Sequence, residues 1–138
     1  MGLYLCVFDD AGDELEGVEV GAYADFNFFR DTVVATVEQG NCGSVCPVLN
    51  NHSDCDGEWT SREAGILLSE LEKAGEVMRQ YPPVEFNSEW KKEVAKMFGI
   101  FPKTLYDCFF DIDGEPLVER LRQLAQVSVS SGQPILFQ

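Results

Sequence analysis

One short stretch holds most of the side chains that could do chemistry. Residues 52–60, with the sequence HSDCDGEWT, contain the only histidine of the chain, two aspartates one residue apart, a turn glycine and a tryptophan. The stretch is close to the calcium-loop pattern D-x-[DN]-x-[DN]-G-x5-E, in which carboxylate oxygens surround the cation. With Gly57 as the turn glycine, Asp54 and Asp56 fall on oxygen-ligand positions and Glu63 on the bidentate position.

Three features of the sequence weigh against calcium at this loop. His52 stands where the first aspartate belongs, and a hard cation disfavours its nitrogen. Residues 41–51 contain Gly43 and Pro47, so they cannot form the entering helix of a helix-loop-helix hand. Glu63 follows Thr60 by three residues, which is typical of a capping box. We therefore favour an acidic turn that precedes a helix, and keep a calcium- or zinc-binding module at residues 52–63 as the alternative.

Zinc is a further possibility for this part of the chain. Cys42, Cys46, His52 and Cys55 supply three thiols and an imidazole, which is a reasonable tetrahedral ligand set. Their spacing matches no standard zinc knuckle well, however. Ordinary reduced cysteines are the favoured interpretation for all five in the chain, and no cofactor is expected.

Enzymatic activity is not expected from this sequence. A nucleophile assisted by histidine has to use His52, and Cys55 lies three residues away without a local catalytic signature. The chain has no G-x-S-x-G elbow, no phosphate-binding P-loop and no G-x-G-x-x-G fingerprint. A small hydrolase that uses this pair is therefore only a formal alternative.

The distribution of charge is more informative. The net charge is −14, and residues 1–60 carry twelve acids against a single base, whereas residues 61–138 carry twelve acids against nine bases. Such an acidic half repels nucleic acid and anionic lipid, and it accelerates encounter with a basic partner. The plain alternative is that the acidity only keeps the protein soluble. The asymmetry favours a basic protein partner.

Hydrophobic periodicity indicates the elements that position these residues. We predict strands over 3–8, 17–21 and 135–137, an interrupted strand over 45–49, and helices over 24–39, 61–79 and 88–98. A last helix opens at Pro116 and is closed by Gly132 and Pro134. In the helix over 88–98, we expect the side chains of Trp90, Val94, Met97 and Phe98 to face inward.

Residues 105–111 fit both a helical and an alternating pattern, and a helix is weakly favoured. With strands separated by helices, the predicted fold is a single compact α+β (or small α/β) domain over residues 1–138. Its small sheet packs against about four helices. No apolar run approaches the roughly 20 residues of a membrane span, and the first residues lack the features of a signal peptide. A cytoplasmic protein without membrane contact is expected.

A second acidic turn, Asp111-Ile112-Asp113-Gly114-Glu115, repeats the pattern of residues 54–58. Arg120 stands where a calcium loop needs its glutamate, so this copy is interpreted as a turn that starts a helix. The same interpretation explains both copies. Trp59 has two interpretations, a core residue that clamps the first turn, which we favour, or an exposed interface aromatic.

Several of these strings together resemble a known family. They are GLYL at residues 2–5, VEVG at 18–21 before YADF at 23–26, HSDCDGEW at 52–59, DIDGEPLVERL at 111–121 and PILFQ at 134–138. The sequence resembles the immunity protein 70 family of bacterial polymorphic toxin systems. The resemblance implies a small cytosolic protein that binds a cognate toxin domain, and it implies no catalytic residues.

The resemblance and the charge together define the expected partner surface. A toxin that is a basic nuclease would suit an acidic inhibitor, and the inhibitor itself would bind no nucleic acid. The candidate partner-binding residues are Asp9, Asp10, Asp13, Glu14, Asp54, Asp56, Glu58, Trp59, Asp111 and Asp113.

Overall fold

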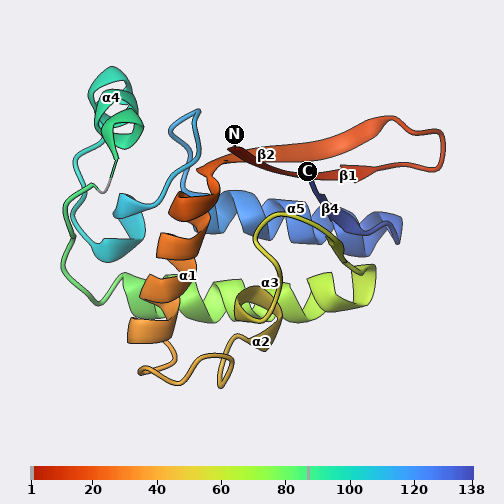
Figure 1. Cartoon of the computed structure of the whole chain (residues 1–138), viewed down its shortest axis with the longest axis horizontal. Helices are drawn as coiled ribbons and strands as arrows, with labels where there is room; N and C mark the ends of the chain where they lie inside the picture. The colour runs from red at the N-terminus through yellow and green to blue at the C-terminus, as the bar shows by residue number, and fades with distance from the viewer. Residues whose placement is uncertain (1, 87) are drawn as a thin grey trace.

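A computed structural model describes residues 2–86 and 88–138. Its sheet has four antiparallel strands in the order β2-β1-β4-β3 (Figure 1). They are β1 (Gly2–Phe8), β2 (Glu14–Ala22), β3 (Glu58–Trp59) and β4 (Ile135–Phe137). The helices lie outside the sheet and the strands are all antiparallel, so the α+β class is confirmed and the small α/β variant is not formed.

The β1–β2 hairpin is the longest part of the sheet. Leu3, Leu5 and Val7 of β1 and Val18 and Val20 of β2 are buried, which is the alternation expected of the face that packs on the core. Cys6 of β1 is buried as well, so part of the opposite face is also covered. The first predicted strand is confirmed. The second is longer than the predicted 17–21, because its first residues pair with the end of β1.

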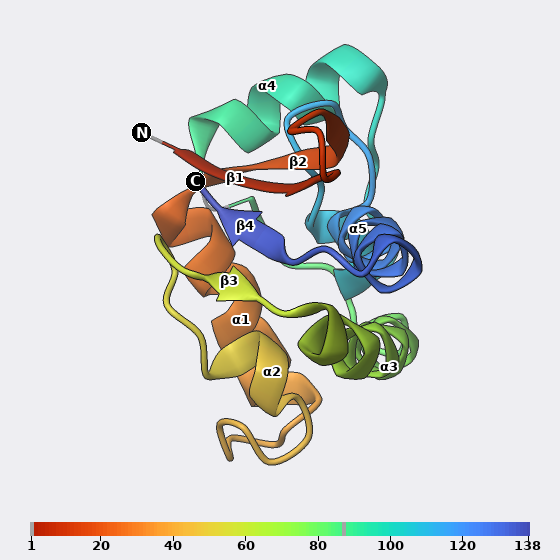
Figure 2. The ribbon, with the colours of Figure 1, turned by 90° about the vertical axis from the view of Figure 1, so that its right-hand side faces the viewer.

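Three helices, α1 (Tyr23–Thr36), α3 (Ser61–Met78) and α5 (Leu117–Ser131), pack below the hairpin (Figures 1 and 2). The apolar stripe of α3 is buried as predicted, and it includes Leu67, Leu71 and Met78. The helix predicted over 24–39 ends at Thr36, and the chain then turns through Gly40 at a φ of +88°. The last predicted helix and the terminal strand are confirmed.

The strand predicted over 45–49 is wrong. The segment forms a short helix, α2 (Pro47–Asn50), with the proline at its first position. The Glu70 carboxylate of α3 accepts the N–H groups of Val48 and Leu49, at 3.1 and 2.9 Å. A buried side chain from elsewhere in the chain therefore supplies the acceptors that a neighbouring strand would have supplied.

The helix predicted over 88–98 exists as α4 (Glu89–Phe98), but its predicted inward face is wrong in part. The structure buries Lys91 and Ala95, whereas Met97 is 73% exposed and Phe98 is 54% exposed. Figure 2 shows α4 on the other side of β2 from α3 and α5. One face of α4 therefore meets the protein, and the side chains of Met97 and Phe98 at its C-terminal end are largely exposed.

The ambiguous segment 105–111 contains both conformations. Leu105–Cys108 forms a single 3₁₀ turn, η1, and Phe110 then pairs with Pro116 in an isolated bridge. Among the described residues, no helix has both the length and the apolar character that crossing a membrane requires.

Candidate functional site

The acidic turn at residues 52–58 lies beside the edge strand β3. The His52 ring stacks on the Phe137 ring, with centroids 4.1 Å apart. Its Nδ1 lies 2.9 Å from the Ser53 carbonyl oxygen and its Nε2 lies 2.9 Å from the Glu58 carbonyl oxygen. Both ring nitrogens thus meet backbone oxygens, so the only histidine of the chain holds the turn together.

Trp59 is a core residue. Its side chain is fully buried, and its Nε1 donates a hydrogen bond to the Val48 carbonyl oxygen at 3.0 Å. A buried indole with a satisfied N–H clamps the turn onto the sheet. The favoured interpretation of Trp59 as a core anchor is confirmed, and the residue lies away from the exposed surface.

Helix α1 fixes the acidic turn from the other side. Asn27 donates a hydrogen bond to the Asp54 carboxylate at 2.7 Å, which holds the pKa of this carboxyl below its usual value. Arg30 donates to the carbonyl oxygens of Leu49 and His52 and to the side chain of Asn27. The turn is therefore ordered by bonds to its backbone, while its other acidic side chains, Asp56 and Glu58, remain exposed.

Neither of the alternative ligand sets, Asp54, Asp56 and Glu63 for calcium or the cysteine and histidine set for zinc, is assembled among the described residues. Glu63 accepts the N–H of Thr60 at 3.0 Å, and the Thr60 hydroxyl accepts the N–H of Glu63 at 3.1 Å. The Glu63 carboxylate is therefore used in a capping box at the start of α3. Of the zinc candidates, Cys46 is buried whereas Cys42 and Cys55 are exposed. Over residues 2–86 and 88–138, no three side chains of His, Cys, Asp or Glu lie together as a metal site would require.

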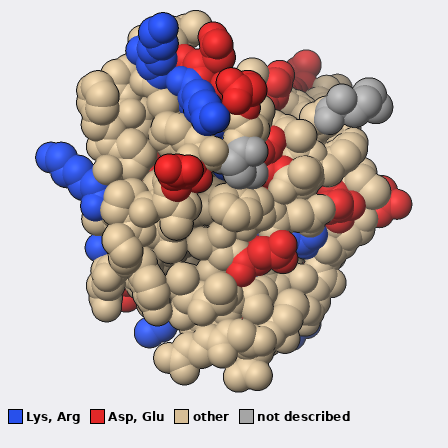
Figure 3. All heavy atoms as spheres, turned by 60° about the vertical axis from the view of Figure 1, so that its left-hand side comes forward, with Lys and Arg blue, Asp and Glu red and all other residues tan. Residues whose placement is uncertain are grey.

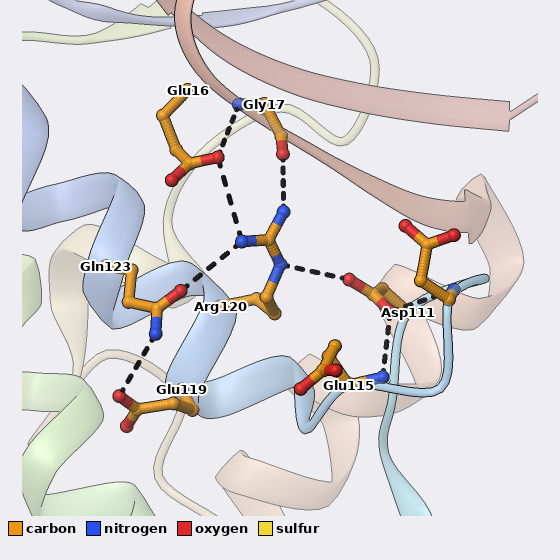
Figure 4. A network of polar contacts seen from close by, with 8 residues as sticks. Glu16, Gly17, Asp111, Glu115, Glu119, Arg120 and Gln123 are labelled. Carbon is orange, nitrogen blue, oxygen red and sulfur yellow. Dashed lines mark hydrogen bonds and ion pairs between the residues drawn. The ribbon is translucent and has the colours of Figure 1, made fainter. Parts of the chain in front are cut away.

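The second acidic turn is built around a buried carboxylate (Figure 4). Asp111 is 1% exposed and accepts the N–H groups of Asp113 and Glu115, each at 3.0 Å. Its other oxygen accepts from Arg120 Nε at 3.1 Å, and Arg120 Nη2 donates to the Gly17 carbonyl oxygen of β2 at 2.7 Å. Asp111 is therefore structural, and the exposed acids of this turn are Asp113 and Glu115.

The hairpin between β1 and β2 carries a third group of acids. Asp9 accepts the N–H groups of Ala11 and Asp13, which shapes the turn, and Asp10, Asp13 and Glu14 are exposed. In the part of the chain that the structure describes, the acids in ion pairs are Glu16, Glu89, Asp111 and Glu119. None of the hairpin-turn acids is among them, so no described cation compensates their charge.

Three acids outside the candidate residues, Asp25, Glu38 and Glu70, are buried. Glu38 is 2% exposed and accepts the N–H groups of Val45 and Cys46 and the Asn50 amide, and Glu70 is 5% exposed. Burial raises the pKa of Glu38, but these hydrogen bonds outweigh it and leave the pKa below its usual value. For Glu70 burial dominates, and the pKa is raised. The acidic composition thus includes carboxylates that organise the interior.

The candidate residues do not form one patch. The hairpin turn adjoins β2 and the turn at 52–58 leads into β3, and these strands are the two opposite edges of the sheet. Figure 3 shows acidic side chains dispersed among neutral ones on the face that it presents, with basic side chains at its top, along its left edge and lower down. The structure therefore offers several distinct acidic surfaces in place of a single one.

Comparison with known proteins gives one clear result. The model of the family described as immunity protein 70 matches residues 3–137, from the first strand to the last. Neither the curated proteins nor the solved structures gave a significant match. Because the match covers nearly the whole chain, this protein belongs to the immunity protein 70 family.

Proposed function

We propose that this protein binds the toxin domain of a cognate bacterial polymorphic toxin in the cytoplasm and neutralises it through exposed acidic side chains. Membership of an immunity protein family carries the proposal. The uncompensated acids of the β1–β2 hairpin and of the turn at 52–58 support the acidic contact. No catalytic role is assigned to the protein, since inhibition by binding needs none.

The charge of the protein indicates the chemistry of the toxin. A chain with a net charge of −14 is attracted to a basic surface, such as the substrate cleft of a nuclease. Complementary charge raises the rate of association and excludes like-charged partners. We therefore propose a basic toxin domain, of which a nuclease is the leading example.

Co-expression tests the function directly. The toxin gene that neighbours the gene of this protein would be induced in a sensitive bacterium with and without the protein. We expect growth only when the protein is present, and co-purification of the two chains. Continued killing, together with no co-purification, would refute the proposal.

Charge reversal tests the acidic contact. Asp10→Lys with Asp13→Lys alters the hairpin turn, and Asp56→Lys with Glu58→Lys alters the turn at 52–58. A reversed pair that faces the toxin should lower the association rate about tenfold at low salt and weaken its salt dependence. The control, Glu72→Lys with Glu76→Lys on α3, makes the same change in net charge. Equal rates for all three variants at every salt concentration would contradict electrostatic steering by these surfaces.

A further inference from the structure

The C-terminal end of α4 exposes an unusual amount of apolar surface. Phe101 is 84% exposed, Met97 is 73% exposed and Phe98 is 54% exposed. Ile112, in the second acidic turn, is 39% exposed. We call these four residues the α4 apolar surface. Contiguous exposed apolar surface on a folded domain is a common feature of interaction sites.

Phe98 and Phe101 both lie beside the second acidic turn. A Cβ atom added at Gly114 would lie 2.8 Å from Cδ2 of Phe98, so the end of α4 packs on the turn at 111–115. A hollow of about 340 Å³ adjoins them, and its lining includes Ile100, Phe101, Phe110 and Pro116. The exposed aromatic side chains can insert into a pocket of a partner, and the hollow beside them can accept a side chain of that partner.

Acidic residues border this region. The N–H of Ile112 donates to the Glu19 carbonyl oxygen at 3.3 Å, which places β2 next to the turn that carries Asp113 and Glu115. Glu19, Asp113 and Glu115 are exposed, and no ion pair among the described residues includes them. The border is mixed in charge, because Lys96 in the last turn of α4 is exposed and Lys103 and Asp107 line the hollow. An apolar centre with a polar rim is the usual anatomy of a protein interface.

We propose that the toxin domain docks on the α4 apolar surface, with Met97, Phe98 and Phe101 as anchors and with Glu19, Asp113 and Glu115 facing basic residues of the toxin. This inference rests on the proposed function. The net charge of the chain favours a basic toxin domain over a second copy of the chain as the molecule that binds this surface. Two copies, each with a net charge of −14, would repel each other, whereas a basic domain would be attracted to the chain.

Binding of the purified toxin domain encoded by the neighbouring gene tests the docking site. Met97→Ser and Phe101→Ser remove the most exposed side chains and should leave the fold intact. Each should raise the Kd about tenfold or more, because aromatic and apolar anchors dominate interface energies. Ile66→Ser is the control, since Ile66 is 48% exposed on α3. Its Kd should equal that of the wild type, and circular dichroism should confirm that all variants are folded.

The outcomes separate the two proposals. If the wild type binds the toxin and both serine variants bind equally well, the docking site is wrong and the proposed function stands. If the wild type neither binds nor protects, both proposals fail. If light scattering shows a concentration-dependent dimer that Phe101→Ser abolishes, the surface serves a second copy and the docking proposal is overturned. An Asp113→Lys variant that associates with the toxin at the wild-type rate would show that Asp113 does not face a basic residue of the toxin.

Discussion

Arg120 and Asp111 form an ion pair across 3.1 Å, and Asp111 lies on the turn that borders the α4 apolar surface. The same guanidinium binds the Gly17 carbonyl oxygen of β2. One α5 side chain therefore ties the second acidic turn to the edge strand of the sheet (Figure 4). The position of the turn depends on a structural arginine in a chain that has few bases.

Removing this arginine should destabilise the protein. Arg120→Ala leaves the buried Asp111 carboxylate without its cation, and we expect the free energy of unfolding to fall by about 2 kcal/mol. Arg122→Ala is the matched control, because Arg122 pairs with Glu119 one turn away on the surface of α5. Urea denaturation should show little change for the control. Equal losses for both variants would show that the Arg120 network has no special role.

The two buried glutamates should give opposite pH dependence. The pKa of Glu38 is lowered in the folded state, so its contribution to stability is present above the unfolded pKa of 4.5 and is lost as the pH falls through the folded pKa. The pKa of Glu70 is raised, so its contribution increases as the pH falls through the folded pKa towards 4.5.

Urea denaturation between about pH 3.5 and pH 7 would measure both effects. The stability difference between the wild type and Glu38→Gln should shrink with acidification, and the difference between the wild type and Glu70→Gln should shift in the opposite direction. The Glu38 variant should lose about 2 kcal/mol at neutral pH, because the buried N–H donors lose a charged acceptor. Parallel slopes for the two variants would contradict this assignment.

The attachment of α4 depends on a glycine of β2. Gly21 has a φ of +116°, and a Cβ atom there would lie 2.7 Å from Cζ2 of Trp90. Trp90 Nε1 donates to the Asp25 carboxylate at 2.8 Å. Gly21→Ala should therefore cost about 3 kcal/mol, from backbone strain and the displaced indole together.

Gly12→Ala is the control for the backbone strain. Gly12 has a φ of +84° in the hairpin turn, but a Cβ atom added there would meet nothing within 4 Å. This variant should lose about 1 kcal/mol by thermal or urea denaturation and leave tryptophan fluorescence unchanged. Gly21→Ala should also change the fluorescence, because it moves Trp90. Equal losses of stability and unchanged fluorescence in both variants would show that the contact between Gly21 and Trp90 is not needed to hold α4 in place.

Local sequence patterns are sufficient to predict the elements whose apolar residues repeat with the period of a strand or a helix. The first strand, the stripe of α3 and the Thr60–Glu63 capping box depend on neighbours within a few residues, and each is confirmed. These features need little information about the rest of the fold.

The predictions fail where contacts between residues distant in the sequence determine the local structure. The α2 segment is helical because the Glu70 and Glu38 carboxylates supply acceptors from other parts of the chain, and no local pattern contains that information. The outward turn of Met97 and Phe98 likewise depends on where α4 meets β2. Asp111 resembles a surface acid in the sequence because its partner, Arg120, lies nine residues away on α5, beyond the reach of a turn pattern.

The place of β4 between β1 and β3 links the acidic turn at 52–58 to the far end of the chain. Leu5 pairs with Phe137, and the Phe137 ring stacks on the His52 ring. Local opening of β4 would thus release the turn at the same time as it exposes the inner edge of β1. The N–H of Phe137 donates to the Gly57 carbonyl oxygen at 3.1 Å, and Trp59 pairs with Ile135. Amide hydrogen exchange at Trp59 and Phe137 should follow one common opening free energy, which would mark the two segments as a single cooperative unit.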